Sequence, residues 1–302
     1  MLIARLIAEP DTLSARLDAA TADLAARGQA IARASMLESD SSVLELVLTS
    51  GDASILRAVI DTHFQPCDLL VTDHVPQIPR VFVSDMDSTM IGQECIDELA
   101  DFAGLKHHIA AITERAMQGE LDFESALRER VLLLRDLPED AIAQCLATRI
   151  VPMPGARVLV ETLKAHGCRT VLVTGGFHHF ADPVAEMLGF EHVVANRLEI
   201  AGGQLTGGLT GPITDSAVKR ATLLAEMAEA GANAGANAGW RATSLATGDG
   251  ANDIPMIEAA TYGIAYHAKP RARDAANGAI DRGDLTSVLR LFGVPETDWT
   301  TG

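Results

Sequence analysis

Short apolar runs that end in glycine or polar residues recur along the chain from residue 80 onward. Three of them are Val81–Val83, Cys168–Val173 and Thr243–Ala246. Such runs predict strands buried on both faces, as in a parallel sheet covered by helices. Ligands of open α/β sheets bind at the carboxyl ends of the strands. The polar residues that follow each run are therefore the first candidates for a functional site.

Residues 1–75 have a pattern of their own. Leu13, Leu17, Ala20 and Leu24 recur at helical spacing before Gly28, which is a typical helix stop. The expected elements are a strand at Met1–Ala8, a helix at Asp11–Arg27, strands at Ile31–Leu37 and Val43–Leu48, a helix at Ala53–His63 and a strand at Cys67–Thr72. The order βαββαβ is that of the ferredoxin-like arrangement. That fold hosts many functions, so the order alone predicts no ligand.

A proline-containing linker, Val75–Pro79, separates this N-terminal unit from the rest of the chain. Residues 92 to about 155 are mostly helical and interrupt the alternation of strands and helices. Helices are expected there at Glu94–Phe102, Ile109–Gln118, Phe123–Leu134 and Glu139–Ala147. The α/β pattern then resumes, with a helix expected at Asp215–Ala230. Residues 230–239 are a near-repeat of Gly, Ala and Asn, which predicts a flexible surface insertion.

The chain is acidic, with 24 Lys and Arg against 41 Asp and Glu and a formal charge of −17. This charge argues against general binding of nucleic acid or anionic membranes, because a basic surface supplies the affinity in those cases. An anionic substrate must therefore be held by local cations or by a metal. The four cysteines form no CxxC pair, so we expect reduced thiols and a cytoplasmic protein. The sequence predicts neither a signal peptide nor a membrane-spanning segment, because its apolar runs are too short for either.

Asp85 and Asp87 follow the first core strand. Side chains repeat every two residues along a strand, so both carboxylates should leave its end on the same side. Two carboxylates this close are costly unless a cation lies between them or one of them is protonated. On this stretch alone a plain turn is an equally good interpretation, because Asp, Ser and Thr are common turn residues.

Two further motifs and one lysine change that balance. In order, DMDST (85–89), TGG (174–176), Lys219 and GDGAND (248–253) resemble the four motifs of the haloacid dehalogenase-like (HAD) phosphohydrolases. The stretches GQECIDELA (92–100), AMQGELDF (116–123), LRERV (127–131) and NRL (196–198) resemble those of phosphoserine phosphatases within that superfamily. The resemblance runs from residue 81 to about residue 292.

The resemblance implies a HAD-like α/β fold with a parallel Rossmannoid sheet and a helical cap at about 92–155. It also implies an ACT-like regulatory or dimerisation domain at 1–75, before a phosphatase domain at 80–302. A structural or dimerising role for the N-terminal unit is at least as good an expectation as sensing of L-serine. The implied partners are O-phospho-L-serine as substrate, L-serine as a feedback ligand and a second copy of the chain.

Catalytic roles follow from the motifs. Asp85 is the expected nucleophile, because a carboxylate can take a phosphoryl group and divide one displacement into two. Asp87 is the expected general acid and base. Lys219 would neutralise negative charge on the phosphoryl group and on Asp85. The expected Mg²⁺ ligands are Asp85, the backbone carbonyl of Asp87, Asp249 and, as an auxiliary, Asp253. Taken alone, Lys219 would be a solvated helix residue.

Substrate-binding residues are also carried over from the resemblance. Thr174 offers a hydroxyl to the phosphate, Gly175 allows close backbone approach, and Asn252 belongs to the same site. The ammonium group of the substrate is assigned to Glu94 and its carboxylate to Arg130, whose guanidinium suits bidentate binding. The apolar residues expected to shield the site are Met117 and Phe123. In isolation these four have ordinary alternatives: a helix N-terminal charge, a surface arginine and core filling.

Two rival functions remain open on the sequence. A phosphotransferase, or a hydrolase of another small phosphomonoester, would need Asp85 and Asp87 but not Glu94 or Arg130. The other rival is a serine-binding regulatory protein whose HAD core is vestigial; the intact motif carboxylates and Lys219 argue against it. The histidine pairs 107–108 and 178–179 are interpreted as structural, because adjacent histidines on a helix point about 100° apart.

Overall fold

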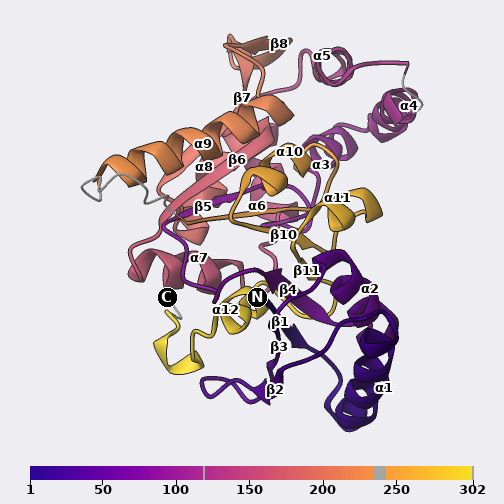
Figure 1. Ribbon diagram of the computed structural model, residues 1–302. Coiled ribbons are helices and arrows are strands. Elements are labelled where there is room, and N and C mark those ends of the chain that lie inside the picture. The colour runs from indigo at the N-terminus through magenta and orange to yellow at the C-terminus, as the bar shows by residue number, and fades with distance from the viewer. Residues whose placement is uncertain (118–119, 234–242, 301–302) are drawn as a thin grey trace.

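The computed structural model of the chain describes residues 1–117, 120–233 and 243–300. Within these residues eleven strands form one mixed sheet in the order β2-β3-β1-β4-β11-β10-β9-β5-β6-β7-β8. Their bounds are β1 (Leu2–Ile7), β2 (Arg33–Met36), β3 (Leu44–Leu48), β4 (Asp68–Thr72), β5 (Val81–Ser84), β6 (Arg169–Phe177), β7 (His192–Ala201), β8 (Gln204–Thr210), β9 (Ser244–Gly248), β10 (Tyr262–Tyr266) and β11 (Gly278–Ile280). Figure 1 shows the two ends of this sheet, β2 and β8, at opposite ends of the molecule.

The six strands from β11 to β7 run parallel and form the centre of the sheet. Strand β5 lies between β9 and β6, with Val81 opposite both Ser244 and Arg169. The three predicted core strands are therefore confirmed as neighbours, and their carboxyl ends meet at one edge. Strand β6 runs to Phe177, beyond its expected end at Val173, with an irregular register between these two residues.

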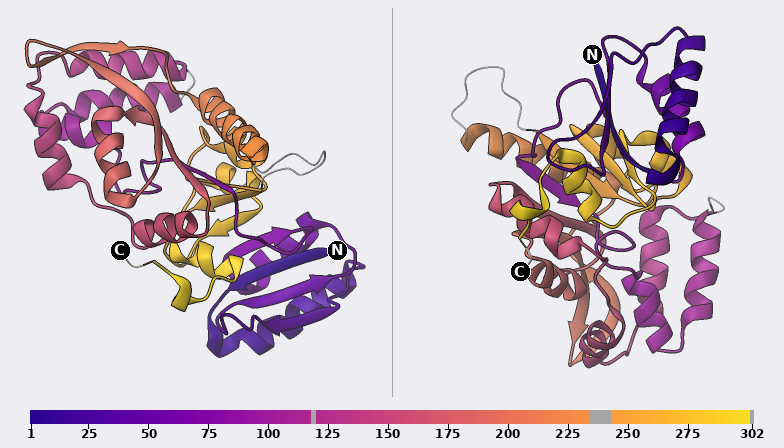
Figure 2. Two further views of the ribbon diagram at one scale, coloured as in Figure 1. Left: turned by 90° about the vertical axis from the view of Figure 1, so that its left-hand side faces the viewer. Right: turned by 90° about the horizontal axis from the view of Figure 1, so that it is seen from below.

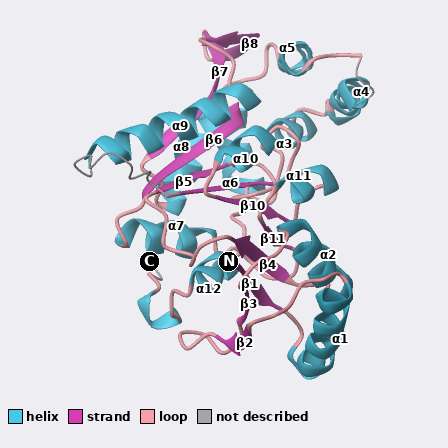
Figure 3. Cartoon of the chain, in the orientation of Figure 1, coloured by secondary structure: helices cyan, strands magenta, loops and turns pink. Residues whose placement is uncertain are grey.

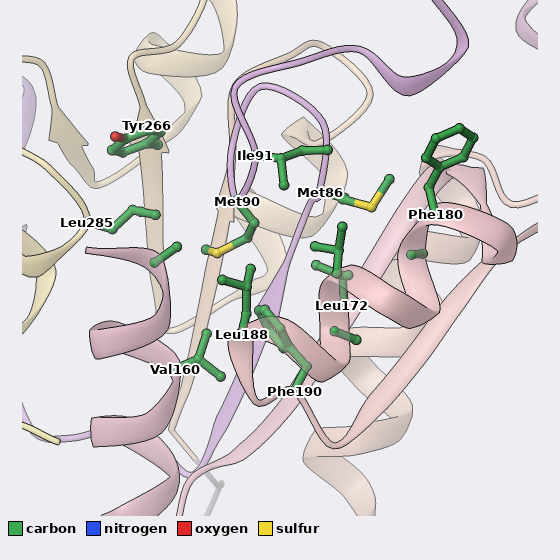
Figure 4. Packing of buried hydrophobic residues seen from close by; sticks show 14 of the residues in the cluster. Met86, Met90, Ile91, Val160, Leu172, Phe180, Leu188, Phe190, Tyr266 and Leu285 are labelled. Carbon is green, nitrogen blue, oxygen red and sulfur yellow. The ribbon is translucent and has the colours of Figure 1, made fainter. Parts of the chain in front are cut away.

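Helices cover both faces of the parallel strands because successive side chains point to opposite sides. Phe82 belongs to a cluster with α7 (Ala156–Ala165), α8 (His178–Leu188) and α12 (Thr286–Phe292). Its neighbours Val81 and Val83 belong to a second cluster with α9 (Ser216–Asn233) and α10 (Ile254–Ala259). Figure 4 shows Met86 and Met90, from the loop after β5, within the first cluster.

The predicted helical segment between residues 92 and 155 contains α3 (Cys95–Phe102), α4 (Lys106–Met117), α5 (Phe123–Leu133) and α6 (Asp140–Arg149). The chain enters and leaves it side by side, since Gly92 N–H donates to the Val151 carbonyl at 3.0 Å. Residues after α5 are tied to the β7–β8 hairpin, because Asp136 N–H donates to the Leu205 carbonyl at 2.8 Å. Figure 2 shows these helices away from the N-terminal strands. Their function as a cap stays a prediction.

The N-terminal segment has the expected βαββαβ order, with α1 (Leu13–Ala26) and α2 (Ala53–Phe64) as its helices. Strand β1 pairs antiparallel with β3 and β4, and β2 pairs with β3. Both helices pack on one face of these strands, while α12 contacts β1 and β4 (Figure 3). The domain boundaries and the ACT-like assignment stay predictions.

The sequence did not predict that strand β4 pairs antiparallel with β11, so that N-terminal and core strands share one sheet. The buried Asp68 secures this junction by accepting N–H groups from Asp281, Arg282 and Gly283 at 2.8–3.1 Å. Its other oxygen accepts the Ser287 hydroxyl at 2.7 Å. The junction is thus a set of charge-assisted hydrogen bonds in the protein interior.

One loop expectation is partly wrong. Residues 230–233 were assigned to a loop insertion but continue helix α9, whose bound is Asn233. Alanine supports a helix well enough to extend it into the Gly/Ala/Asn repeat. Residues 234–239 lie outside the described part of the chain. Among described helices, none has the length and apolar character needed to cross a membrane.

Candidate active site

Asp85 begins the loop after β5 and is only 4% exposed. Its backbone N–H donates to the Thr247 carbonyl at 2.9 Å, which extends the pairing of β5 with β9 by one residue. Its carboxylate oxygen Oδ1 accepts the Met86 N–H at 2.8 Å. The parallel strands therefore fix Asp85 at their carboxyl edge, as the strand pattern predicted.

Lys219, from helix α9, lies beneath this edge and is 1% exposed. Its Nζ lies 2.7 Å from Asp85 Oδ1 and 2.7 Å from Asp253 Oδ1. Burial lowers the pKa of Lys219, but the two carboxylates outweigh this effect and raise it overall. The ammonium group is therefore held as a buried cation between two motif carboxylates. The second oxygen of Asp253 accepts the Gly250 N–H at 3.0 Å.

Asp85, Asp249 and Asp253 form a buried carboxylate cluster whose oxygens lie within 4.8 Å of one another. Burial raises the pKa of Asp85, as does the charge of Asp253, and Lys219 opposes the rise. Burial also raises the pKa of Asp249. Three carboxylates against one buried ammonium leave an excess of negative charge. A hard divalent cation with oxygen ligands fits this donor set.

Asp87 lies beside the cluster, on the side of helix α3. Its Oδ1 accepts the Cys95 N–H at 3.4 Å. Burial and the charge of Glu94 raise the pKa of Asp87 to about 7. Ser88 adopts a positive φ of 54° and donates its hydroxyl to Glu94 Oε1 at 2.8 Å. Asp87 is therefore able to hold a proton near neutral pH, which a general acid requires.

Thr174 and Gly175 face the cluster from the irregular end of β6. Gly176 N–H donates to Thr174 Oγ1 at 2.9 Å, so the Thr174 hydroxyl hydrogen is available to another acceptor. The carbonyl of Gly175 accepts Asn196 Nδ2 at 2.8 Å. A Cβ on Gly175 would lie 3.1 Å from Phe123 Cζ, which shows how closely the helical segment approaches the strand end.

These residues surround a cavity of about 230 Å³. Of the predicted site residues, the cavity wall contains Asp85, Asp87, Glu94, Phe123, Arg130, Thr174, Gly175, Asp249 and Asn252. Arg130 donates Nε to the Ala126 carbonyl at 3.3 Å, one turn earlier on α5. Lys219 and Asp253 lie behind the wall, where Lys219 contacts both Asp85 and Asp253. Met117 ends helix α4, and its side chain lies outside the described part of the chain.

Comparison with known proteins agrees with this arrangement. A model of the haloacid dehalogenase-like hydrolase family matches residues 82–258. A phosphoserine phosphatase of Albidiferax ferrireducens is 43% identical over 214 residues, which are 70% of this chain and 89% of that protein. The chain belongs to the haloacid dehalogenase-like hydrolases. Within them it belongs to the phosphoserine phosphatase family.

Two crystal structures extend the similarity to nearly the whole fold. A HAD family hydrolase from Salmonella enterica serovar Typhi superposes with a TM-score of 0.79 at 27% identity, over 98% of this chain and 99% of that one. A probable phosphoserine phosphatase from Vibrio cholerae superposes with a TM-score of 0.73 at 29% identity, over 98% and 88%. The N-terminal segment of this hydrolase is thus included in both superpositions.

Sequence reasoning missed several residues of the hydrolase site. The cavity wall also contains Ile96, Leu127, Phe177 and Lys269, as well as Gly176 of the TGG motif, to which no role was assigned. The Nζ of Lys269 lies 3.6 Å from Asp249 Oδ2. No local pattern pointed to Lys269, because the lysine lies in a loop remote from the motifs. The apolar wall residues follow from helix and strand periodicity only once the partner elements are known.

Proposed function

We propose that this hydrolase converts O-phospho-L-serine and water to L-serine and phosphate, with Mg²⁺, through an aspartyl-phosphate on Asp85. One observation carries the proposal: the wall of a single cavity contains both motif carboxylates, with Lys219 behind Asp85, and an anion–cation pair, Glu94 and Arg130. The first set suits a phosphate group. The second suits the ammonium and carboxylate groups of an amino acid.

In the first step the carboxylate oxygen of Asp85 attacks phosphorus, and the bond between phosphorus and the serine oxygen breaks. The leaving oxygen takes a proton from Asp87, whose pKa of about 7 leaves it partly protonated near neutral pH. Thr174 donates its hydroxyl to a phosphoryl oxygen. The charge of Lys219 favours the ionised form of Asp85, since it opposes the rise in pKa caused by burial.

In the second step a water molecule attacks the phosphorus of the aspartyl-phosphate. Asp87, now ionised, accepts a proton from that water. The bond between phosphorus and the Asp85 oxygen breaks, which restores the carboxylate and releases phosphate. Phe123, over Gly175, limits access of other water to the intermediate.

The carboxylates of Asp85, Asp249 and Asp253 would hold Mg²⁺, together with the backbone carbonyl of Asp87. When bound, the ion would offset the negative charge of phosphate and carboxylates and polarise a phosphoryl oxygen. The excess of buried negative charge in the cluster supports this assignment.

Recognition of the amino-acid part is assigned to Glu94 and Arg130. The carboxylate of Glu94, which lies beside Asp87, would accept hydrogen bonds from the ammonium group of the substrate. Arg130 would bind the carboxylate through its terminal amino groups, because its Nε is already engaged with Ala126. A substrate without these two groups would lose both interactions.

The wider assignments rest on the family resemblance. They are a place at the last step of L-serine biosynthesis, a cytoplasmic location, and an ACT-like domain at 1–75 that binds L-serine or a second copy of the chain. The helices at 92–155 would act as the cap of the phosphatase domain at 80–302.

The experiment is phosphate release from O-phospho-L-serine, O-phospho-L-threonine and 4-nitrophenyl phosphate, with and without Mg²⁺. We expect kcat/KM to favour phosphoserine strongly in the wild type. Arg130→Ala should remove most of that preference and leave 4-nitrophenyl phosphate hydrolysis in place. Equal reactivity of all three esters, unchanged in Arg130→Ala, would show that the substrate assignment is wrong.

A further inference from the structure

Asp97 is a partly buried carboxylate beside the proposed amino-acid site that the mechanism does not use. It lies in the first turn of α3, three residues after Glu94, which precedes the helix. Residues three apart lie on the same side of a helix. Glu94 lines the cavity and Asp97 does not. Asp97 is therefore placed one turn behind the residue assigned to the substrate ammonium group.

The Oδ1 atom of Asp97 is buried and has no hydrogen-bond partner among the described residues. An unsatisfied buried polar atom costs about 1–3 kcal/mol, so such atoms call for an explanation. Burial raises the pKa of Asp97, and the charges of Arg130 and Lys106 oppose that rise. Arg130 is thus the cation that acts most strongly on this carboxylate.

Arg130 has hydrogen-bond donors that lack an acceptor. Its one described hydrogen bond uses Nε, which leaves the two terminal amino groups without a partner in the described part of the protein. Burial lowers the pKa of Arg130; the opposing charges are, in decreasing order, those of Asp97, Glu94 and Asp87. The strongest anionic neighbour of Arg130 is therefore Asp97, outside the cavity, rather than the carboxylates inside it.

Asp97 and Arg130 are not hydrogen-bonded to each other in the structure. We propose that Asp97 is a positioning residue for Arg130: when the substrate binds, the free oxygen of Asp97 accepts a hydrogen bond from one terminal amino group, and the other edge of the guanidinium is turned toward the substrate carboxylate. A planar guanidinium offers two edges, so one edge can bond to the protein while the other binds a ligand. The inference rests on the proposed function, because it assumes that Arg130 binds a carboxylate.

The test compares Asp97→Asn with Glu98→Gln. The control removes the same charge from the adjacent residue of α3, whose partner is Arg149 rather than Arg130. The substrates are O-phospho-L-serine and O-phosphoethanolamine, which has the ammonium and phosphate groups but no carboxylate. We expect Asp97→Asn to raise KM for phosphoserine about tenfold, the factor for one weakened charge-assisted hydrogen bond, with kcat within about twofold. The KM of Asp97→Asn for phosphoethanolamine should stay unchanged. The KM values of Glu98→Gln for both substrates should also stay unchanged.

A double-mutant cycle separates positioning from a general structural effect. In the Arg130→Ala background, Asp97→Asn should cause no further rise in KM, and Asp97→Glu should restore part of the wild-type value in the presence of Arg130. Equal losses on both substrates, or additive losses in the double variant, would overturn the inference. A wild type that does not prefer phosphoserine to phosphoethanolamine would instead overturn the proposed function.

Discussion

Replacing Lys219 by methionine is the most informative perturbation of the buried charges. The ammonium group bridges Asp85 and Asp253 at 2.7 Å each, and all three residues are at most 4% exposed. Methionine fills similar space but leaves two buried carboxylates without a counter-charge. Removing one partner of a buried ion pair costs about 3–5 kcal/mol. For a chain of this size that corresponds to a loss of about 6–10 °C in Tm.

The pH dependence of this loss has a definite sign. Without Lys219, the two carboxylates must bind protons to stay buried, so their pKa values in the folded state lie well above those in the unfolded chain. A raised carboxyl pKa destabilises the folded state increasingly as pH rises above the unfolded value of about 4. The loss in Tm should therefore be larger at pH 8 than at pH 5. A divalent cation should restore part of it at pH 8.

Thermal unfolding followed by circular dichroism at pH 5 and pH 8, with and without Mg²⁺, gives the measurement. Lys106→Met is the matched control, because Lys106 is 65% exposed and lies 4.0 Å from Asp101. Its Tm should change by less than about 1 °C, as for other surface substitutions. The reasoning fails if Lys219→Met loses less than about 2 °C at pH 8, where the buried pair predicts the largest effect. An equal loss in Tm at both pH values would refute only the argument that the buried carboxylates must bind protons; the loss of the buried ion pair itself would still stand.

Three further predictions concern the site and the sheet junction. The kcat/KM for phosphoserine should fall as pH rises through about 7, the pKa of Asp87. Glu94→Gln should move this fall to lower pH, because a negative neighbour raises that pKa; an unmoved profile would contradict the assignment. Gly175→Ala should lower kcat/KM by displacing Phe123, and the effect should largely vanish in Phe123→Ala, with a coupling of about 1 kcal/mol; additive effects would exclude this contact. Asp68→Asn should lower the free energy of urea unfolding by about 2–3 kcal/mol through weakened charge-assisted hydrogen bonds; a change below about 0.5 kcal/mol would show that the junction is not held this way.

Much of the fold follows from local pattern. The helix predicted at Phe123–Leu134 is observed at Phe123–Leu133, and the apolar run at Val81–Val83 forms a strand inside the parallel sheet, as its pattern predicted. The pairing of β4 with β11 could not be predicted, because an edge strand carries no sequence signal for its partner. Strand β6 is longer than predicted. Residues Thr174–Gly176 are typical of a turn, but pairing with the neighbouring β7 continues as far as Phe177 and keeps this segment extended.

The site was predictable where chemistry depends on fixed spacing. Asp85, Asp87 and the GDGAND stretch follow strands that the pattern located, so their convergence was foreseeable. Lys219 depended on the order of motifs, since an isolated helical lysine is normally solvated. Lys269 carried no signal in the sequence, and Asp97 lies in the GQECIDELA stretch (92–100) but had no role assigned to it. Their importance comes from elements brought together only by the tertiary fold.

The most direct test of the account is rapid acid quenching of the wild type during turnover of ³²P-labelled O-phospho-L-serine with Mg²⁺, followed by peptide mass spectrometry. The account predicts a transient, hydroxylamine-sensitive phosphoryl group on Asp85, absent from Asp85→Asn, whose turnover should be abolished. Phosphate release without label on Asp85, or full turnover by Asp85→Asn, would contradict it.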